Sequence, residues 1–173
     1  RPYKKHELAI RAFNRLGLPL VIAGYGEEYK RLRKIAGPNI TFITRFNDSQ
    51  KAWLFAHCQA FVNPQEEDSG IVALEAMAAG RPVLAYSRGG ALETILPGVT
   101  GQFFGEQSVD GLIDAVRVFE PSDYDPIRIR EHARQFDVAR FLAQIWQVIL
   151  QARRERAQLS FARRSGQFAL PLI

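Results

Sequence analysis

The chain has 173 residues, of which 47% are hydrophobic and 24% charged, a composition typical of one globular domain with a substantial core. No apolar run approaches the roughly 18 residues of a membrane span, and the single cysteine, Cys58, excludes an internal disulfide or a cysteine-based metal cluster. Much of the net charge of +5 comes from residues 151–173, where five arginines face one glutamate, and this argues against a nucleic-acid-binding body.

Apolar spacing predicts helices and strands that alternate along the chain. Helices are expected over residues 6–16, 27–36, 48–57, 70–79, 109–119 and 126–135, then from Asp137 onward with Val138, Phe141, Leu142, Ile145 and Ile149 on one stripe. Short apolar runs predict strands over residues 19–23, 40–44, 60–63, 83–86 and 102–104. The last ~15 residues lack a clear period, and no structure is assigned to them.

This alternation predicts an α/β, Rossmann-like fold with a mostly parallel sheet and flanking helices. Ligands of such folds bind at the carboxyl ends of strands, so the loops that start at Gly24, Thr44, Pro64 and Ser87 are candidates. A dinucleotide fingerprint starting at Gly24 would need Gly or Ala at position 29, where Tyr29 stands, which disfavours NAD binding. The three histidines have no metal-ligand spacing, so no metal site is expected.

The segment from Glu67 to Glu75 carries most of the functional information. Glu67 lies in a loop after a predicted strand, and Gly70 and Ile71 begin a helix whose first N–H groups form a ready phosphate site. Glu75 lies one turn beyond Ile71 on the same face, so both carboxylates can flank one ligand. Carboxylates repel phosphate but accept hydrogen bonds from sugar hydroxyls, which favours a nucleotide sugar.

Spacing alone leaves a plainer interpretation open. Glu75 could be a surface residue of an alanine-rich helix, and Glu66, Glu67 and Asp68 could form a solvated acidic loop. The basic segment likewise has two interpretations, as a solvated helix end or as a weak attachment to an anionic membrane.

The wider sequence resembles the retaining GT-B glycosyltransferases of family 4. Glu67 and Glu75 match the E-x7-E motif of that family, and the resemblance runs from Tyr3 to about Ile149. It also rests on Gly70, Glu75-Ala76-Met77-Ala78, Gly80-Arg81-Pro82-Val83, Gly89-Gly90 with Glu93, and Gly98-Val99-Thr100-Gly101. Within the family, the segment around residues 67–86 is most similar to bacterial mannosyltransferases.

The resemblance implies a role for each matching residue. Glu67 would contact hydroxyls of the transferred sugar, Glu75 would hold the ribose, and Lys4 would neutralise the diphosphate leaving group. Lys4 could also be only a solvated lysine at a helix start. The remaining expected donor contacts are the backbone near Gly70, Ile71 and Val72, the Gly24 loop, and Arg45 and Phe46 on the base.

Two departures from the family pattern are visible. Ser69 stands where the family has an aromatic residue, mostly Phe, and a smaller polar side chain would reshape the sugar pocket. The family also has an arginine partner of the lysine on a central strand that would precede residue 1. Because the only methionine is Met77, we expect the chain to be a piece of a longer protein.

The resemblance implies the carboxyl-terminal, donor-binding domain of a GT-B enzyme in residues 1–150, followed by a basic helix end and tail in residues 151–173. The whole enzyme would transfer mannose or another hexose from a GDP- or UDP-sugar such as GDP-mannose, with no cofactor or metal. Its acceptor, a glycan or lipid-linked glycan of polysaccharide biosynthesis, would bind a missing amino-terminal domain. We expect it in the bacterial cytoplasm, peripheral at the inner face of the membrane. The alternative is a truncated fragment that binds nucleotide without catalysis.

Overall fold

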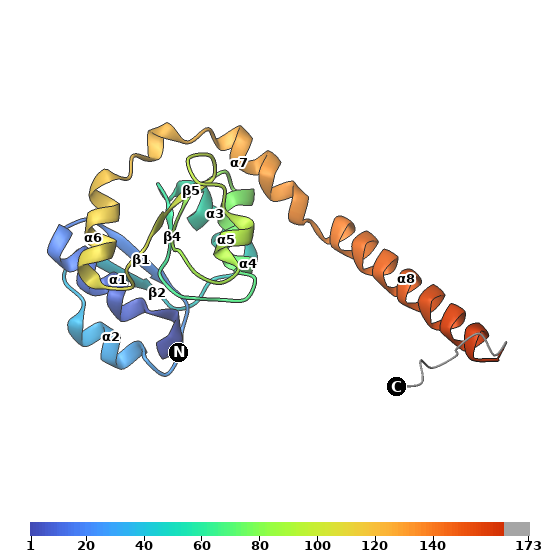
Figure 1. Cartoon of the computed structure of the whole chain (residues 1–173). Helices are drawn as coiled ribbons and strands as arrows, with labels where there is room; N and C mark the ends of the chain where they lie inside the picture. Colours follow the sequence, from blue (N-terminus) through green and yellow to red (C-terminus); the bar gives the residue numbers. More distant parts are fainter. Residues whose placement is uncertain (165–173) are drawn as a thin grey trace. The chain divides into compact units, whose positions relative to one another are not determined.

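The structure is a computed structural model that describes residues 1–164, with side chains described for residues 1–158 (Figure 1). It divides into two compact units, Arg1–Arg134 and a second unit that begins at Gln135. The sequence predicted a different division, into a donor-binding domain of residues 1–150 and a basic end of residues 151–173. That division concerns function, and it stays a prediction.

The first unit alternates helices and parallel strands, so the predicted α/β class is confirmed. The strands are β1 (Leu20–Ala23), β2 (Ile40–Ile43), β3 (Phe61–Asn63), β4 (Val83–Tyr86) and β5 (Gly101–Phe104). The helices are α1 (His6–Leu16), α2 (Tyr29–Ile35), α3 (Asp48–His57), α4 (Ile71–Ala78), α5 (Ala91–Thr94), α6 (Val109–Val118) and α7 (Pro126–Ala133), with 3-10 turns at Pro2–Lys4, Pro121–Asp123 and Arg134–Phe136. The sequence did not predict α5, because four residues are too few to show a period.

The strands form two parallel sheets. β1 pairs with β2, from Leu20 beside Ile40 to Ala23 beside Ile43. β4 pairs with β3 on one side and with β5 on the other. Within the described residues, β1 and β3 each have one hydrogen-bonded neighbour, so one continuous sheet is not observed.

One apolar core joins the two sheets. Ile10 and Phe13 of α1 pack with Ile40 of β2, Leu84 of β4 and Leu112 of α6. Full burial of side chains of this size contributes about 1.5–3 kcal/mol each. The sheets therefore belong to one folding unit although no hydrogen bonds join them.

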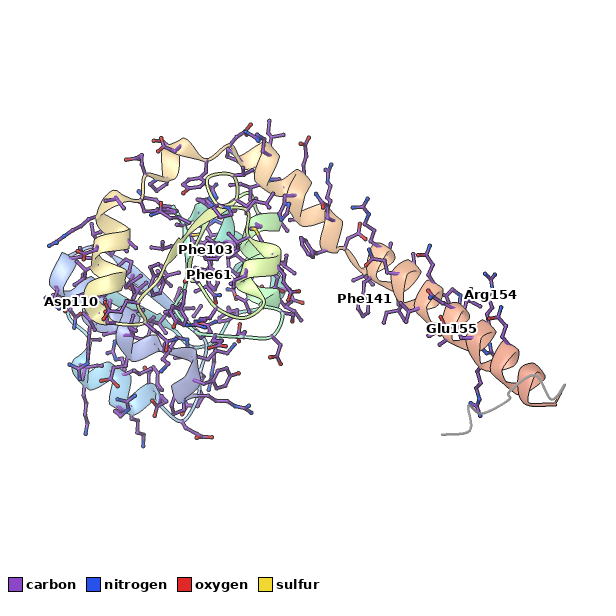
Figure 2. All side chains as sticks on the ribbon, in the orientation of Figure 1. Phe61, Phe103, Asp110, Phe141, Arg154 and Glu155 are labelled. Atoms are coloured by element: carbon purple, nitrogen blue, oxygen red, sulfur yellow. The ribbon has the colours of Figure 1, made fainter. Side chains whose placement is uncertain are left out.

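A second core lies under α4, and its members are Ala73, Ala76, Met77, Val83, Ala85, Ala91, Ile95, Tyr124, Ile129 and Ala133. Phe61 and Phe103 pack against it from the interior of the unit, whereas Asp110 lies on the surface (Figure 2). The alanines on the buried face of α4 let α7 pack closely on that helix. The second core thus holds α4, the helix that carries Glu75, in a fixed position.

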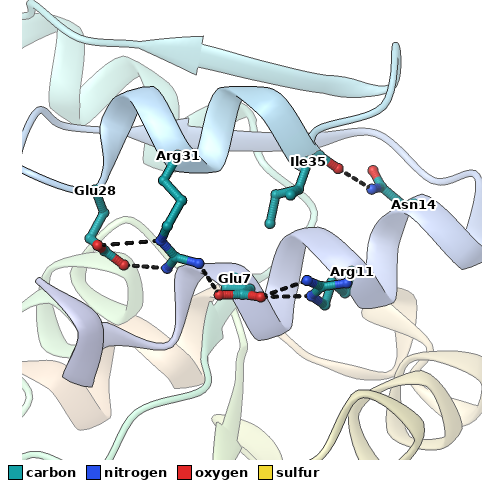
Figure 3. A network of polar contacts seen from close by, with 6 residues as sticks. All are labelled: Glu7, Arg11, Asn14, Glu28, Arg31 and Ile35. Carbon is teal, nitrogen blue, oxygen red and sulfur yellow. Dashed lines mark hydrogen bonds and ion pairs between the residues drawn. The ribbon is translucent and has the colours of Figure 1, made fainter.

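Polar contacts tie α1 to α2 (Figure 3). Arg31 of α2 pairs with both Glu28 and Glu7, and Glu7 also accepts a 2.8 Å hydrogen bond from Arg11. The Arg31 guanidinium lowers the pKa of both carboxyls, mainly through these hydrogen bonds. At the other end, the Asn14 side-chain amide donates to Ile35 O at 2.7 Å. The pair of helices is thereby held at both ends.

The second unit contains α8 (Val138–Arg164). The final helix predicted from the sequence is confirmed. The prediction that no regular structure follows it is wrong for residues 159–164, which continue α8. A helix propagates one hydrogen bond per residue once it has nucleated, so it needs no apolar period. Residues 165–173 lie outside the described residues. None of the described helices is both long and apolar enough to cross a bilayer.

Candidate active site

The loop between β3 and α4 builds the candidate site. Its first part is anchored, since Pro64 and Gln65 are buried and Gln107 donates to Pro64 O at 2.9 Å. The Gln65 side-chain amide lies 3.2 Å from Glu67 Oε2, so it donates to that carboxylate. Gly70 then ends the loop with a left-handed φ of 63° and precedes α4. The predicted position of Glu67, after a strand and before a helix, is the one observed.

The Gly89-Gly90 turn, which follows β4, lies in close backbone contact with this loop. Gly90 N donates to Glu67 O at 2.7 Å. A Cβ on Gly89 would lie 2.4 Å from Glu67 O, and one on Gly90 would lie 2.0 Å from Asp68 O. Gly89 also has a φ of 61°, which a residue with a side chain rarely adopts. These glycines are therefore required by the shape of the Glu67 loop.

Lys4 forms an ion pair with Glu67 across 63 positions of sequence. Lys4 ends the first 3-10 turn, and the side chains of both partners are partly buried, with 27% of Lys4 and 16% of Glu67 exposed. An ion pair screened from water is stronger than one on an open surface. The structure thus brings together the two side chains to which the resemblance assigns the catalytic roles.

An open pocket of about 470 Å³ surrounds this ion pair. Its lining is Tyr3, Lys4, Glu66, Glu67, Asp68, Ser69, Gly70, Ile71 and Val72. Six of these are predicted site residues, and they come from two distant parts of the chain. The backbone hydrogen bonds of α4 begin with Ala73 N and Leu74 N to Gly70 O, so the amides of Ile71 and Val72 precede this ladder. Such amides, with the positive end of the helix dipole, form a site for a phosphate.

Glu75 lies further along α4, outside the nine residues that line the pocket. Its Oε1 is 2.7 Å from Nζ of Lys51 on α3, and 36% of each side chain is exposed. The hydrogen bond to Glu75 raises the pKa of Lys51. Sequence reasoning missed Lys51, because no spacing rule connects a lysine on one helix with a glutamate 24 residues later.

Gly24, Arg45 and Phe46 form a separate group at the carboxyl end of the β1–β2 sheet. Gly24 N donates to Ile43 O at 2.9 Å, which joins the two loops. Arg45 is exposed and Phe46 partly buried. None of the three lines the pocket around Glu67.

Cys58 and His6 lie outside this pocket and also have shifted pKa values. Burial raises the pKa of the Cys58 thiol, and Cys58 donates to Phe55 O at 3.3 Å, as expected for a packing residue. Burial also lowers the pKa of His6, with a further contribution from the chain's amino terminus. In residues 1–164 no group of three or more His, Cys, Asp or Glu side chains could hold a metal ion.

Sequence and structure comparisons bear on the function. The family model described as "Glycosyl transferases group 1" matches residues 1–136. The alpha-1,3/1,6-mannosyltransferase of Homo sapiens is 38% identical over 104 residues, 56% of this chain and 25% of that protein. The GDP-mannose-dependent alpha-(1-6)-phosphatidylinositol monomannoside mannosyltransferase of Mycobacterium tuberculosis is 36% identical over 113 residues, 58% of this chain and 29% of that protein.

Solved structures agree on the fold. Sucrose-phosphate synthase from Thermosynechococcus elongatus superposes with a TM-score of 0.76 at 25% identity, over 88% of this chain and 43% of that one. The Anabaena protein HepE in complex with UDP gives a TM-score of 0.72 at 23% identity, over 87% of this chain and 46% of that one. The chain therefore spans less than half the length of these proteins and less than a third of the two mannosyltransferases.

Proposed function

Because this chain belongs to the group 1 glycosyltransferases, we propose that its first unit binds the nucleotide-sugar donor of a retaining hexosyltransferase. The observation that carries the proposal is the pocket in which Lys4 and Glu67 meet beside the start of α4. It offers a cation and free amides for phosphates, and carboxylate oxygens for sugar hydroxyls.

Donor binding would exchange the ion pair for contacts with the ligand. Lys4 would turn from Glu67 to the diphosphate, whose negative charge grows as the bond to the sugar breaks. The Glu67 carboxylate, released from Lys4 and still held by Gln65, would accept hydrogen bonds from the transferred sugar. Glu75, oriented by Lys51, would accept from the ribose. Catalysis would thus consist of positioning and charge stabilisation, with no metal ion required.

The donor we favour is GDP-mannose, with a UDP-hexose as the second choice. The Mycobacterium tuberculosis relative is named as GDP-mannose-dependent, and the HepE structure contains UDP. Ser69, polar and exposed at the pocket, would leave more room beside the sugar than an aromatic residue. Gly24, Arg45 and Phe46, outside this pocket, would contact the base.

The acceptor we propose is a glycan or lipid-linked glycan at the inner face of a membrane. The Mycobacterium tuberculosis relative is named for a phosphatidylinositol monomannoside acceptor. The chain spans less than a third of the two mannosyltransferases, so the second candidate function is nucleotide binding without sugar transfer.

Titration calorimetry with GDP, GDP-mannose, UDP and UDP-glucose tests donor binding. We expect heat from at least one nucleotide sugar, with a Kd within the range of about 1 µM to 1 mM typical of substrates. No heat with any of the four would overturn the donor-binding proposal. Release of GDP from GDP-mannose in the presence of a lipid-linked acceptor separates the active enzyme from the binding fragment.

A further inference from the structure

The carboxylate of Glu67 has a different partner on each of its two oxygens. Lys4 forms the ion pair at Oε1, and the side-chain amide of Gln65 lies 3.2 Å from Oε2. Because a carboxylate only accepts hydrogen bonds, the amide nitrogen of Gln65 is the atom that faces it. A diphosphate attracts the charged lysine much more strongly than the neutral amide. Donor binding would therefore free Oε1 and leave Oε2 bonded.

Gln65 reaches Glu67 from the interior of the protein. Only 6% of Gln65 is exposed, and it does not belong to the residues that line the pocket. Burial of an amide is unfavourable unless the amide is hydrogen-bonded. In the described part of the chain, the bond to Glu67 is the one hydrogen bond of this side chain. Its burial is thus compensated at the carboxylate of a candidate catalytic residue.

Other residues hold the backbone of the loop. Gln107 donates to Pro64 O at 2.9 Å, and Gly90 N donates to Glu67 O at 2.7 Å. These two bonds fix the backbone before and after Gln65. The contribution of the Gln65 side chain is therefore the direction of the Glu67 carboxylate.

Lys4 has a second contact that does not involve Glu67. Its Nζ lies 5.2 Å from the centre of the Tyr3 ring, within the range of a cation–π interaction. Tyr3 and Lys4 both line the pocket. The lysine can thus exchange Glu67 for a diphosphate without leaving the pocket, while the bond from Gln65 to Oε2 is kept.

We propose that Gln65 is a positioning residue that occupies Glu67 Oε2 and leaves Oε1 as the single carboxylate oxygen offered to the transferred sugar. This role rests on the donor-binding function proposed above. A carboxylate with both oxygens free can accept from two neighbouring hydroxyls, whereas Glu67 held by Gln65 presents one oxygen in a fixed direction. Gln65 thereby limits which part of the sugar Glu67 can reach.

Calorimetry with GDP-mannose and with GDP measures this role, because GDP lacks the sugar that Glu67 would contact; UDP-glucose and UDP replace them if the chain prefers uridine. Gln65→Met keeps the length of the side chain but removes the donor. We expect it to weaken binding of the nucleotide sugar roughly three- to tenfold more than binding of the free nucleotide. Equal losses for the two ligands would overturn the proposed role.

Gln107→Met is the matched control, because Gln107 donates to the backbone of the same loop and not to Glu67. It should lower Tm and weaken binding of the nucleotide sugar and of the free nucleotide by similar factors. A loss confined to the nucleotide sugar in this variant as well would show that any disturbance of the loop has this effect, and it would overturn a specific role of Gln65.

Gln65→Glu adds a measurement that a packing role would not change. The new carboxyl would lie beside Glu67, and the other charged groups that line the pocket are Lys4, Glu66 and Asp68. Two carboxyls this close share a proton, and the new one can donate to Glu67 only when it is protonated. The affinity of this variant for the nucleotide sugar, relative to the unchanged protein, should therefore rise as the pH falls from about 8 to about 5.5. A constant ratio of affinities over this range would contradict the proposed hydrogen bond.

Unfolding without nucleotide separates this role from donor binding itself. A double-mutant cycle of Gln65→Met and Glu67→Met measures the coupling between the two side chains, and we expect the double variant to lose less stability than the sum of the single losses. Additive losses together with normal donor binding would overturn the role of Gln65 alone. Coupling together with no binding of any nucleotide sugar by the unchanged protein would overturn donor binding, and with it the role of Gln65 toward the sugar.

Discussion

Replacing Gly90 with alanine tests whether the Gly89-Gly90 turn shapes the candidate site. The added Cβ would lie 2.0 Å from Asp68 O, 2.6 Å from Asp68 C and 2.9 Å from Ser69 Cα. These are backbone atoms, so no side chain can rotate away, and the two segments must separate by about 1 Å or more. Overpacking of this kind costs about 1–3 kcal/mol, which for this chain length lowers Tm by roughly 2–12 °C.

The displaced segment includes Asp68 and Ser69, which line the pocket, and Glu67, whose backbone oxygen accepts a hydrogen bond from Gly90 N. The substitution should therefore change the shape of the pocket as well as the stability of the fold. Thermal unfolding followed by circular dichroism, and calorimetry with GDP-mannose below the unfolding range, measure the two effects. Gly105→Ala is the matched control, since its Cβ would meet nothing within 4 Å and its φ is not positive; it should change stability by no more than about 1 kcal/mol. An unchanged Tm and unchanged affinity for Gly90→Ala would refute the reasoning.

Three further substitutions test individual contacts. Glu75→Ala should weaken binding of plain GDP more than Glu67→Ala, because GDP contains ribose but no transferred sugar; the reverse order in calorimetry would contradict these roles. Lys51→Met should weaken GDP binding roughly two- to fivefold, while Lys51→Arg should retain it. Equal GDP affinities of the unchanged protein and both variants would show that the Lys51–Glu75 ion pair has no role in nucleotide binding. Arg31 lowers the pKa of Glu7 in the folded protein below its ordinary value of 4.5. The Arg31–Glu7 ion pair therefore stabilises the fold fully above pH 4.5, and this contribution is lost as the pH falls through the lowered pKa. The Arg31→Gln variant should therefore lose less Tm than the unchanged protein when the pH is lowered. The same dependence of Tm on pH in both proteins would contradict a stabilising role for the Arg31–Glu7 ion pair.

Most of the fold could be predicted from local patterns. The apolar face of α1, with Ala9, Ala12 and Phe13 buried as the periodicity indicates, and the short apolar strands are properties of neighbouring residues. Patterns failed where an element was very short, as in α5, or where helix continued without a period, as in the last residues of α8. The separation of the strands into two sheets could not be predicted, because strand partners are chosen by tertiary packing.

The candidate site divides in the same way. The sequence by itself placed Glu67 in a loop after a strand, Gly70 at a helix start and Glu75 one turn into that helix, since these positions depend on short spacings along the chain. Only the tertiary structure decided that Lys4 meets Glu67, that Lys51 holds Glu75, and that Gly90 limits the loop. These contacts join residues 22 to 63 positions apart. Their formation depends on how helices and strands pack around the shared cores, and no local period encodes that packing.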